Sequence, residues 1–288
     1  MKKTIISCVL FLTAVTAFSQ TTMKTAAEAK LSASDLAVKI ADRILATTTY
    51  EFKNTKTGKT YKSVKNLPLD MNVKVACKYN NWHYTNGVTH IALMELADKT
   101  GAKKYDDYVF KNMNFVFNEG NLDFFKKQYD QAMKDEGWYG VRKLSWHMIF
   151  RGKRLDDNGP MGASLIDLQM KHPNNSFLNY INETAEHLNY GEPRLADGTI
   201  ARIWPHENTI WADDAFMAIS FLARMAKMTG DMNYINDAAN QVIKYHKYLW
   251  CPEKRILYHC YHTDTDEHGV AHWSRANGWV FMATADLL

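Results

Sequence analysis

Residues 211–234 read WADDAFMAISFLARMAKMTGDMNY and contain one complete helix with the signals for its start and its end. Asp213 can be the N-cap or lie in the first turn, where an acid satisfies free backbone N–H groups and meets the positive end of the helix dipole. Arg224 and Lys227 are the charged residues in the remainder of the helix. A helix with so few charges is buried on several sides. Gly230 then supplies the left-handed residue that ends it.

The same pattern returns along the chain. The phrase Thr-Gly-x-x-x-Tyr separates two predicted helices at residues 100–105 and again at residues 229–234. A third pair is predicted over residues 162–171 and 177–188. In each pair a mainly apolar helix precedes an amphipathic one, which predicts an all-α (α/α)6 barrel of six helical hairpins. The apolar face predicted for the helix over 234–249 consists of Ile235, Ala238, Ala239, Val242, His246 and Leu249.

The two ends of the sequence differ from the repeated part. An apolar helix starts at Gly278 and the sequence ends within it at Leu288. We therefore expect residues 34–288 to form the barrel domain without its last C-terminal helices. Residues 21–33 are expected to be a flexible lead-in, and residues 50–78, rich in lysine, are expected to form a loop.

Residues 1–20 have the composition of a signal peptide. Lys2 and Lys3 precede an apolar run that ends near small residues, and the run is shorter than the roughly 18 residues of a membrane-spanning helix. We therefore expect an exported protein, periplasmic or extracellular, without membrane insertion.

The net charge bears on the partners of the protein, and the cysteine content bears on its disulfides. The formal charge is +4, of which two positive charges belong to Lys2 and Lys3, so the rest of the chain carries +2. This balance gives no support for nucleic acid as a partner. Cys77, Cys251 and Cys260 follow the leader. Their odd number and wide spacing imply no disulfide framework, although a single bridge stays an alternative.

Acids, aromatic residues and cations gather at four predicted loops or helix starts, which would lie at one mouth of a barrel. Aromatic faces stack on sugar rings and arginine binds a carboxylate bidentately, so this set of side chains suits an acidic sugar. The four clusters are residues 82–84, residues 154–160, Arg202 and His206 with residues 211–214, and residues 259–279.

Each residue of these clusters can also have a purely structural role when it is considered alone. Trp82 and Trp279 can be core residues, the Asp156-Asp157 pair can cap a helix, and Arg275 can form a structural ion pair. A metal is a further alternative for the histidines of the last cluster, but their spacing matches no structural zinc pattern. We therefore expect neither a metal nor a cofactor. The histidines are His259, His262, His268 and His272.

Two motifs point to a known family. Residues 211–217 follow W-x-D-D-x-F-M and residues 273–279 follow W-x-R-x-N-G-W. Together with the turn at 229–234 they closely resemble glycoside hydrolase family 105, the unsaturated rhamnogalacturonyl hydrolases, which have a six-hairpin (α/α) barrel. The resemblance spans roughly residues 80–288 and implies an oligosaccharide as substrate.

The resemblance also implies site residues. The general acid/base falls on Asp213 and a second active-site acid on Asp156, with Asp157 as its alternative. The site histidine falls on His259, with His262 as its alternative. The expected substrate-binding residues are Tyr84, Arg202, Trp211, Asp214, His259, Trp273, Arg275 and Trp279.

The implied reaction is hydration of a vinyl ether. Polysaccharide lyases leave a C4=C5 double bond on the terminal uronic acid, and a protonated Asp213 would donate its proton to C4 while water adds at C5. The related family 88, which acts on unsaturated glucuronyl disaccharides, is the nearest alternative. A non-catalytic uronide-binding barrel and an all-helical scaffold protein are alternatives from other functional classes.

Overall fold

The computed structural model describes residues 32–151 and 154–288. The predicted leader and residues 21–31 of the lead-in lie outside the described residues. The chain divides into two compact units between Thr47 and Thr48. In the first unit, helix α2 (Ala33–Thr47) starts with reciprocal hydrogen bonds between Ser32 and Asp35, as in a capping box.

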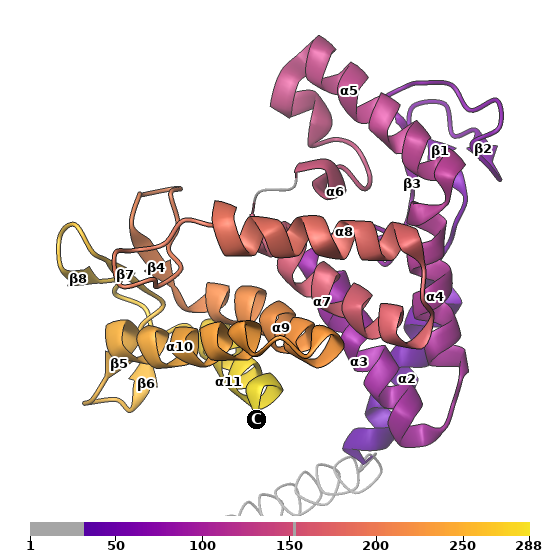
Figure 1. Cartoon of the computed structure of the whole chain (residues 1–288). Helices are drawn as coiled ribbons and strands as arrows, with labels where there is room; N and C mark the ends of the chain where they lie inside the picture. The colour runs from indigo at the N-terminus through magenta and orange to yellow at the C-terminus, as the bar shows by residue number, and fades with distance from the viewer. Residues whose placement is uncertain (1–31, 152–153) are drawn as a thin grey trace, which may run out of the picture. The chain divides into compact units, whose positions relative to one another are not determined.

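The second unit is built from helices that form an inner and an outer row (Figure 1). Contacts run from α3 to α7, from α7 to α9 and from α9 to α11, while α4, α8 and α10 each pack on the inner helix that precedes them. This arrangement confirms the predicted all-α architecture of (α/α) hairpins. The inner helices are α3 (Tyr84–Thr100), α7 (Leu155–Lys171), α9 (Ala212–Thr229) and α11 (Ser274–Leu287). The outer helices are α4 (Lys104–Phe117), α8 (Asn175–Glu186) and α10 (Met232–Leu249).

The burial of the helices explains why α7 and α9 are inner helices and α8 and α10 are outer ones. Helices α7 and α9 are buried on nearly all sides, whereas α8 and α10 bury one face. Two details of the predicted face of α10 are wrong, because Gln241 and Tyr245 are buried there and His246 is exposed. Gln241 can be buried because its side chain bonds the backbone of Gly198 and Ile200, which leaves no polar atom of the amide unsatisfied.

Glycines set the turns and the closest helix contacts. Gly101 and Gly230 adopt φ angles of 71° and 74° and cap α3 and α9, as the repeated phrase predicted. At Gly159 in α7, a Cβ atom would overlap the carbonyl oxygen of Met217 in α9. This close approach brings the N-terminal ends of the two inner helices together.

Several elements were not predicted. Residues 50–78, expected to be a loop, contain the sheet β2-β1-β3, in which Phe52, Val73 and Val75 are buried. Its strands are too short to show an alternating pattern. Two further small sheets are β4-β7-β8 and β5-β6. The strands are β1 (Phe52–Asn54), β2 (Thr60–Tyr61), β3 (Val73–Val75), β4 (Thr209–Trp211), β5 (Trp250–Cys251), β6 (Ile256–Leu257), β7 (Cys260–His262) and β8 (Glu267–His268).

The remaining segments are α5 (Glu119–Val141), which contains a kink at Gly137, the short α6 (Met148–Arg151), and a π-helical turn, η1 (His187–Gly191), after α8. Within residues 32–151 and 154–288, no helix combines the length and the apolar character that crossing a membrane requires. In this part of the chain, Cys251 and Cys260 are free thiols.

Candidate active site

The starts of the four inner helices surround a cavity of about 230 Å³. Residues from all four predicted clusters line it, together with Met217, the last residue of the W-x-D-D-x-F-M motif, and two residues that the sequence did not point to, Met148 and Arg151. The predicted lining residues are His83, Tyr84, Asp156, Asp157, Arg202, Trp211, Asp213 and Arg275.

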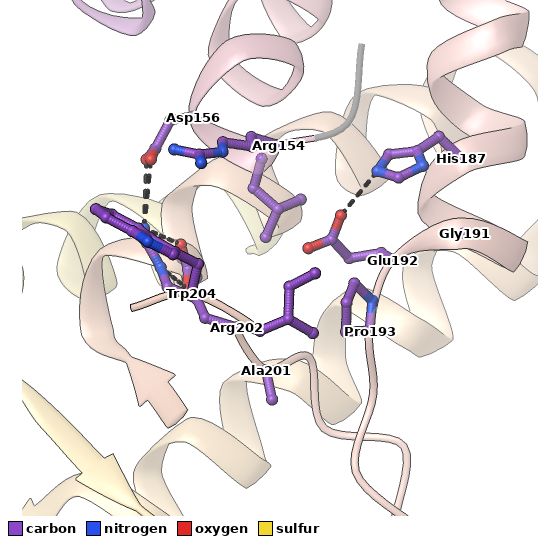
Figure 2. Close-up of a pocket in the computed structure, with 12 residues that line it drawn as sticks. Arg154, Asp156, His187, Gly191, Glu192, Pro193, Ala201, Arg202 and Trp204 are labelled. Carbon is purple, nitrogen blue, oxygen red and sulfur yellow. Dashed lines mark hydrogen bonds and ion pairs between the residues drawn. The ribbon is translucent and has the colours of Figure 1, made fainter. Parts of the chain in front are cut away.

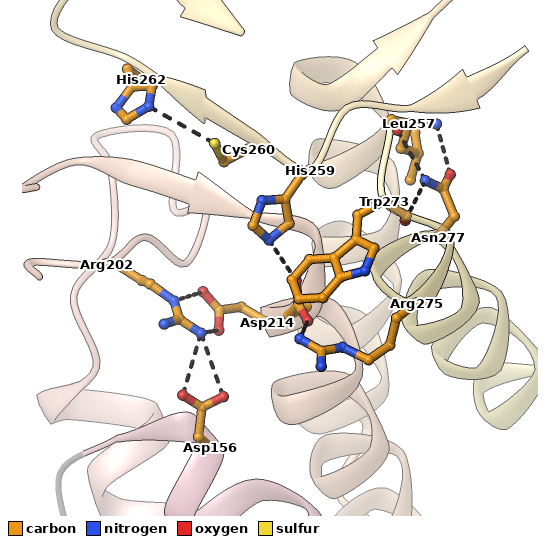
Figure 3. A network of polar contacts seen from close by, with 11 residues as sticks. Asp156, Arg202, Asp214, Leu257, His259, Cys260, His262, Trp273, Arg275 and Asn277 are labelled. Atoms are coloured by element: carbon orange, nitrogen blue, oxygen red, sulfur yellow. Dashed lines mark hydrogen bonds and ion pairs between the residues drawn. The ribbon is translucent and has the colours of Figure 1, made fainter. Parts of the chain in front are cut away.

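Asp213 lies in the first turn of α9 and its side chain is 9% exposed. Its Oδ2 atom lies 3.1 Å from Nε2 of His259, and its Oδ1 atom lies 3.7 Å from Nη2 of Arg275. The pairing of β4 with β7 positions the histidine, because the N–H of Ala212 donates to the carbonyl of His259 at 2.9 Å. His262 instead contacts Cys260 (Figure 3) and Thr209. Of the two histidines considered, His259 is therefore the one at Asp213.

Asp214 does not line this cavity and is bound to Arg202. The guanidinium donates to both carboxylate oxygens, at 2.6 and 2.8 Å, and contacts Asp156 at 3.4 Å (Figure 3). Burial raises the pKa of Asp214 to about 6, although the charge of Arg202 opposes the shift. The side chain of Asp214 is 1% exposed, and both of its oxygens accept hydrogen bonds from Arg202. Its contacts hold Arg202, which also lies 4.2 Å over the ring of Trp211. The expected contact of Asp214 with the substrate stays a prediction.

The two acids at the start of α7 have different surroundings. Asp157 is buried and is paired with Arg151, and burial raises its pKa against that pairing. Its backbone carbonyl accepts a hydrogen bond from the indole of Trp82, which is a core residue. The side chain of Asp156 is 35% exposed and open to the cavity. Arg151 gave no signal in the sequence, because it lies outside the predicted helix pairs.

The tryptophans of the last cluster differ as well. Trp273 is partly exposed, with the guanidinium of Arg275 3.8 Å from its ring center and His259 at its edge. Trp279 stacks on Phe216 at 5.2 Å and meets Tyr84 edge-on. It lines neither cavity described here, and its expected contact with the substrate stays a prediction.

A second cavity, of about 220 Å³, adjoins the first and shares Asp156 and Arg202 with it (Figure 2). Its inner end holds Glu192, whose Oε2 atom lies 3.0 Å from Nε2 of His187. Burial, with the negative charge of Asp214 nearby, raises the pKa of Glu192 to about 8. The sequence gave no signal for Glu192, because it stands in the irregular loop between α8 and β4.

In the described ranges, no group of three or more histidine, cysteine, aspartate or glutamate side chains is arranged to hold a metal ion. The residues that line the two cavities offer carboxyl groups, imidazoles, guanidiniums and aromatic faces.

A family model and a curated relative both match this chain, and both are glycoside hydrolases. A family model described as Glycosyl Hydrolase Family 88 matches residues 55–288. The chain is 26% identical over 180 residues to the unsaturated rhamnogalacturonyl hydrolase YesR of Bacillus subtilis (strain 168), which covers 59% of this chain and 47% of YesR. The chain thus spans about half the length of this curated relative.

Solved structures share the fold. A family 105 glycoside hydrolase of C. acetobutylicum ATCC 824 superposes with a TM-score of 0.55 at 22% identity, over 77% of this chain and 55% of that one. A possible member of family 105 from Klebsiella pneumoniae subsp. pneumoniae MGH 78578 superposes with a TM-score of 0.58 at 14% identity, over 90% and 60%.

Proposed function

Because the chain belongs to glycosyl hydrolase family 88, we propose that it removes 4,5-unsaturated galacturonyl or glucuronyl residues from the non-reducing ends of lyase-generated oligosaccharides. The observation that carries this proposal is the carboxyl group of Asp213, held between His259 and Arg275 beside a cavity that Tyr84 also lines. The similarity to the unsaturated rhamnogalacturonyl hydrolase YesR supports the galacturonyl form. The leader predicted at residues 1–20 supports a reaction outside the cytoplasm.

The proposed reaction takes place at the double bond. Asp213 donates a proton to C4, and the positive charge that develops at C5 is shared with the ring oxygen. Water adds at C5, and the proton that it loses returns to Asp213. The hemiketal at C5 opens, and the hemiacetal left at C1 then expels the rest of the sugar chain as an alcohol. His259 holds one oxygen of the acid in place.

Arg275 is the proposed partner of the uronate carboxylate. Arg202 and Arg151 each pair with a buried carboxylate, whereas the guanidinium of Arg275 is half-exposed and its nearest acid oxygen, on Asp213, is 3.7 Å away. Stacking on Trp273 orients its planar fork toward a ligand. A bidentate pair with the uronate is the interaction that such a group forms well.

The test follows the ultraviolet absorbance of the conjugated double bond with unsaturated galacturonyl and glucuronyl disaccharides. We expect the absorbance to fall in the presence of the protein. Binding of these disaccharides, measured by calorimetry, without loss of absorbance would favour the non-catalytic uronide-binding barrel.

A further inference from the structure

Residues 50–78, here called the basic lobe, carry a charge opposite to that of the chain that follows them. The lobe holds seven lysines and two acids, a net charge of +5, and neither arginine nor histidine. Residues 79–288 hold 22 basic and 26 acidic residues, a net charge of −4. Such a separation concentrates positive potential on one part of the surface, where it attracts anions.

The strands of the lobe bring lysines together. Lys53 in β1 is directly opposite Lys74 in β3. The residues beside them along the strands are buried, so both lysines belong to the outer face of the sheet. Like charges in directly opposite positions destabilise a sheet, and a bound anion would relieve their repulsion.

The turn between β1 and β2 adds two exposed lysines, Lys56 and Lys59. Its backbone is fixed, because Oδ1 of Asn54 accepts hydrogen bonds from the N–H groups of Lys56 and Thr57, at 2.9 and 3.0 Å. Gly58 closes the turn with a φ angle of 75°. The lobe therefore holds these charges on an ordered turn next to the sheet.

The positive charge of the lobe is not balanced by neighbouring acids. Among the described residues, none of its seven lysines forms an ion pair, whereas Lys126 and Lys127 of the adjoining α5 pair with Asp130 and Asp123. Helix α5 packs on the sheet, since its Gln128 donates to the backbone carbonyl of Val73 (Figure 1). The lysines of the lobe are Lys53, Lys56, Lys59, Lys62, Lys65, Lys74 and Lys78.

The composition of the lobe favours one class of anion. It contains no arginine, the residue whose planar fork recognises the phosphates of nucleic acids. Leu69 is its one exposed large apolar side chain, which is too little apolar surface to enter a lipid bilayer. A chain of uronates presents one carboxylate on every ring, and separate ammonium groups can neutralise such carboxylates without a fixed geometry.

We propose that the basic lobe binds an acidic polysaccharide, a chain of uronates, and so holds the protein on the polymer from which its substrates are released. The lobe lines neither cavity of the candidate active site, so polymer binding and turnover are separate properties. The choice of a polyuronate as partner rests on the proposed hydrolysis of unsaturated uronides.

The test measures binding to polygalacturonate by affinity electrophoresis, with the fully methyl-esterified polymer, which has the same backbone without its charges, as the neutral comparison. We expect binding of the charged polymer alone. The binding should weaken with salt, because the screening length falls from about 30 Å at 0.01 M to about 10 Å at 0.1 M. In the triple variant Lys53→Gln, Lys56→Gln and Lys59→Gln, the dissociation constant should rise about tenfold or more.

The matched control is the triple variant Lys227→Gln, Lys247→Gln and Lys254→Gln, which removes the same charge at exposed positions outside the lobe. Its dissociation constant should change less than about twofold. Both triple variants should turn over an unsaturated disaccharide as fast as the wild type, because none of the six lysines lines a cavity described above.

Equal weakening by the two triple variants would show that net charge, and not the lobe, attracts the polymer, and would overturn the proposal. No binding of polygalacturonate by the wild type would also overturn it. So would tighter binding to phosphatidylserine vesicles or to duplex DNA, since the partner would then be a lipid surface or a nucleic acid. If the wild type binds the polymer through the lobe but turns over no unsaturated disaccharide, the lobe stands and the proposed function fails.

Discussion

Arg202 is the residue on which the wall between the two cavities depends. It binds both oxygens of Asp214, contacts Asp156 and lies over Trp211. Such a buried pair is costly to break from one side, because the remaining partner keeps its charge without compensation. The pair of Arg202 and Asp214 therefore allows a prediction about stability that does not depend on activity.

Replacing Arg202 with Met should lower the free energy of unfolding by about 3–5 kcal/mol, because Asp214 is left buried and unpaired. The double variant Arg202→Met with Asp214→Asn should recover much of the loss, since the uncompensated charge is gone. Denaturant unfolding measures both. Lys126→Met, which breaks the exposed pair with Asp130, should cost less than about 1 kcal/mol. A double variant as unstable as the single one would contradict the role of the charge.

Glu192 should make stability depend on pH. Its pKa rises from 4.5 to about 8 on folding, so the folded protein holds this proton more tightly than the unfolded chain. Below pH 4.5 the group is protonated in both states, and as pH rises toward 8 its burial destabilises the fold. Glu192→Gln should therefore gain stability over the wild type by a few kcal/mol across this range.

Thermal unfolding of both proteins at several pH values checks this prediction. Glu95→Gln, at an exposed position of α3, is the control and should follow the wild type. Parallel curves for Glu192→Gln and the wild type would show that the buried carboxyl group does not titrate as inferred.

At the scale of elements, packing of α7 on α9 holds the acids of the site together. Gly159→Ala would drive a methyl group into the carbonyl of Met217, where neither backbone can yield. We expect a loss of about 3 kcal/mol or more in the free energy of unfolding. At Gly278 in α11 no atom lies within 4 Å of an added Cβ, so Gly278→Ala should instead add about 0.5–1 kcal/mol. Equal effects of the two substitutions would contradict the close helix contact.

The helices were predictable and the strands were not, for physical reasons. Apolar residues at helical spacing, with Gly101 and Gly230 as stops, carry a signal over many residues. Strands of two or three residues carry none, yet the pairing of β4 with β7 is what brings His259 to Asp213. The helix α5 was missed because its charged residues obscure any apolar face.

At the scale of the whole molecule, the two sequence motifs predicted family 105 with family 88 as its relative, and the match of residues 55–288 to the family 88 model confirms a glycoside hydrolase of this 105/88 type. The predicted clusters also meet in one cavity, because the inner helices start at the same end. The second cavity could not be predicted. It depends on how the irregular loop around Glu192 and Trp204 packs against the start of α7, and such a loop has no periodicity.

The central claim is that Asp213 protonates a double bond instead of assisting displacement at the anomeric carbon. The most direct measurement uses a sulfur-linked glycoside of the unsaturated uronate, whose leaving group resists ordinary acid-assisted displacement, and follows the absorbance of the double bond. The account predicts loss of absorbance with the wild type, at a rate comparable to the oxygen-linked substrate, and none with a folded Asp213→Asn variant. Turnover of the oxygen-linked substrate alone, or undiminished turnover by Asp213→Asn, would contradict it.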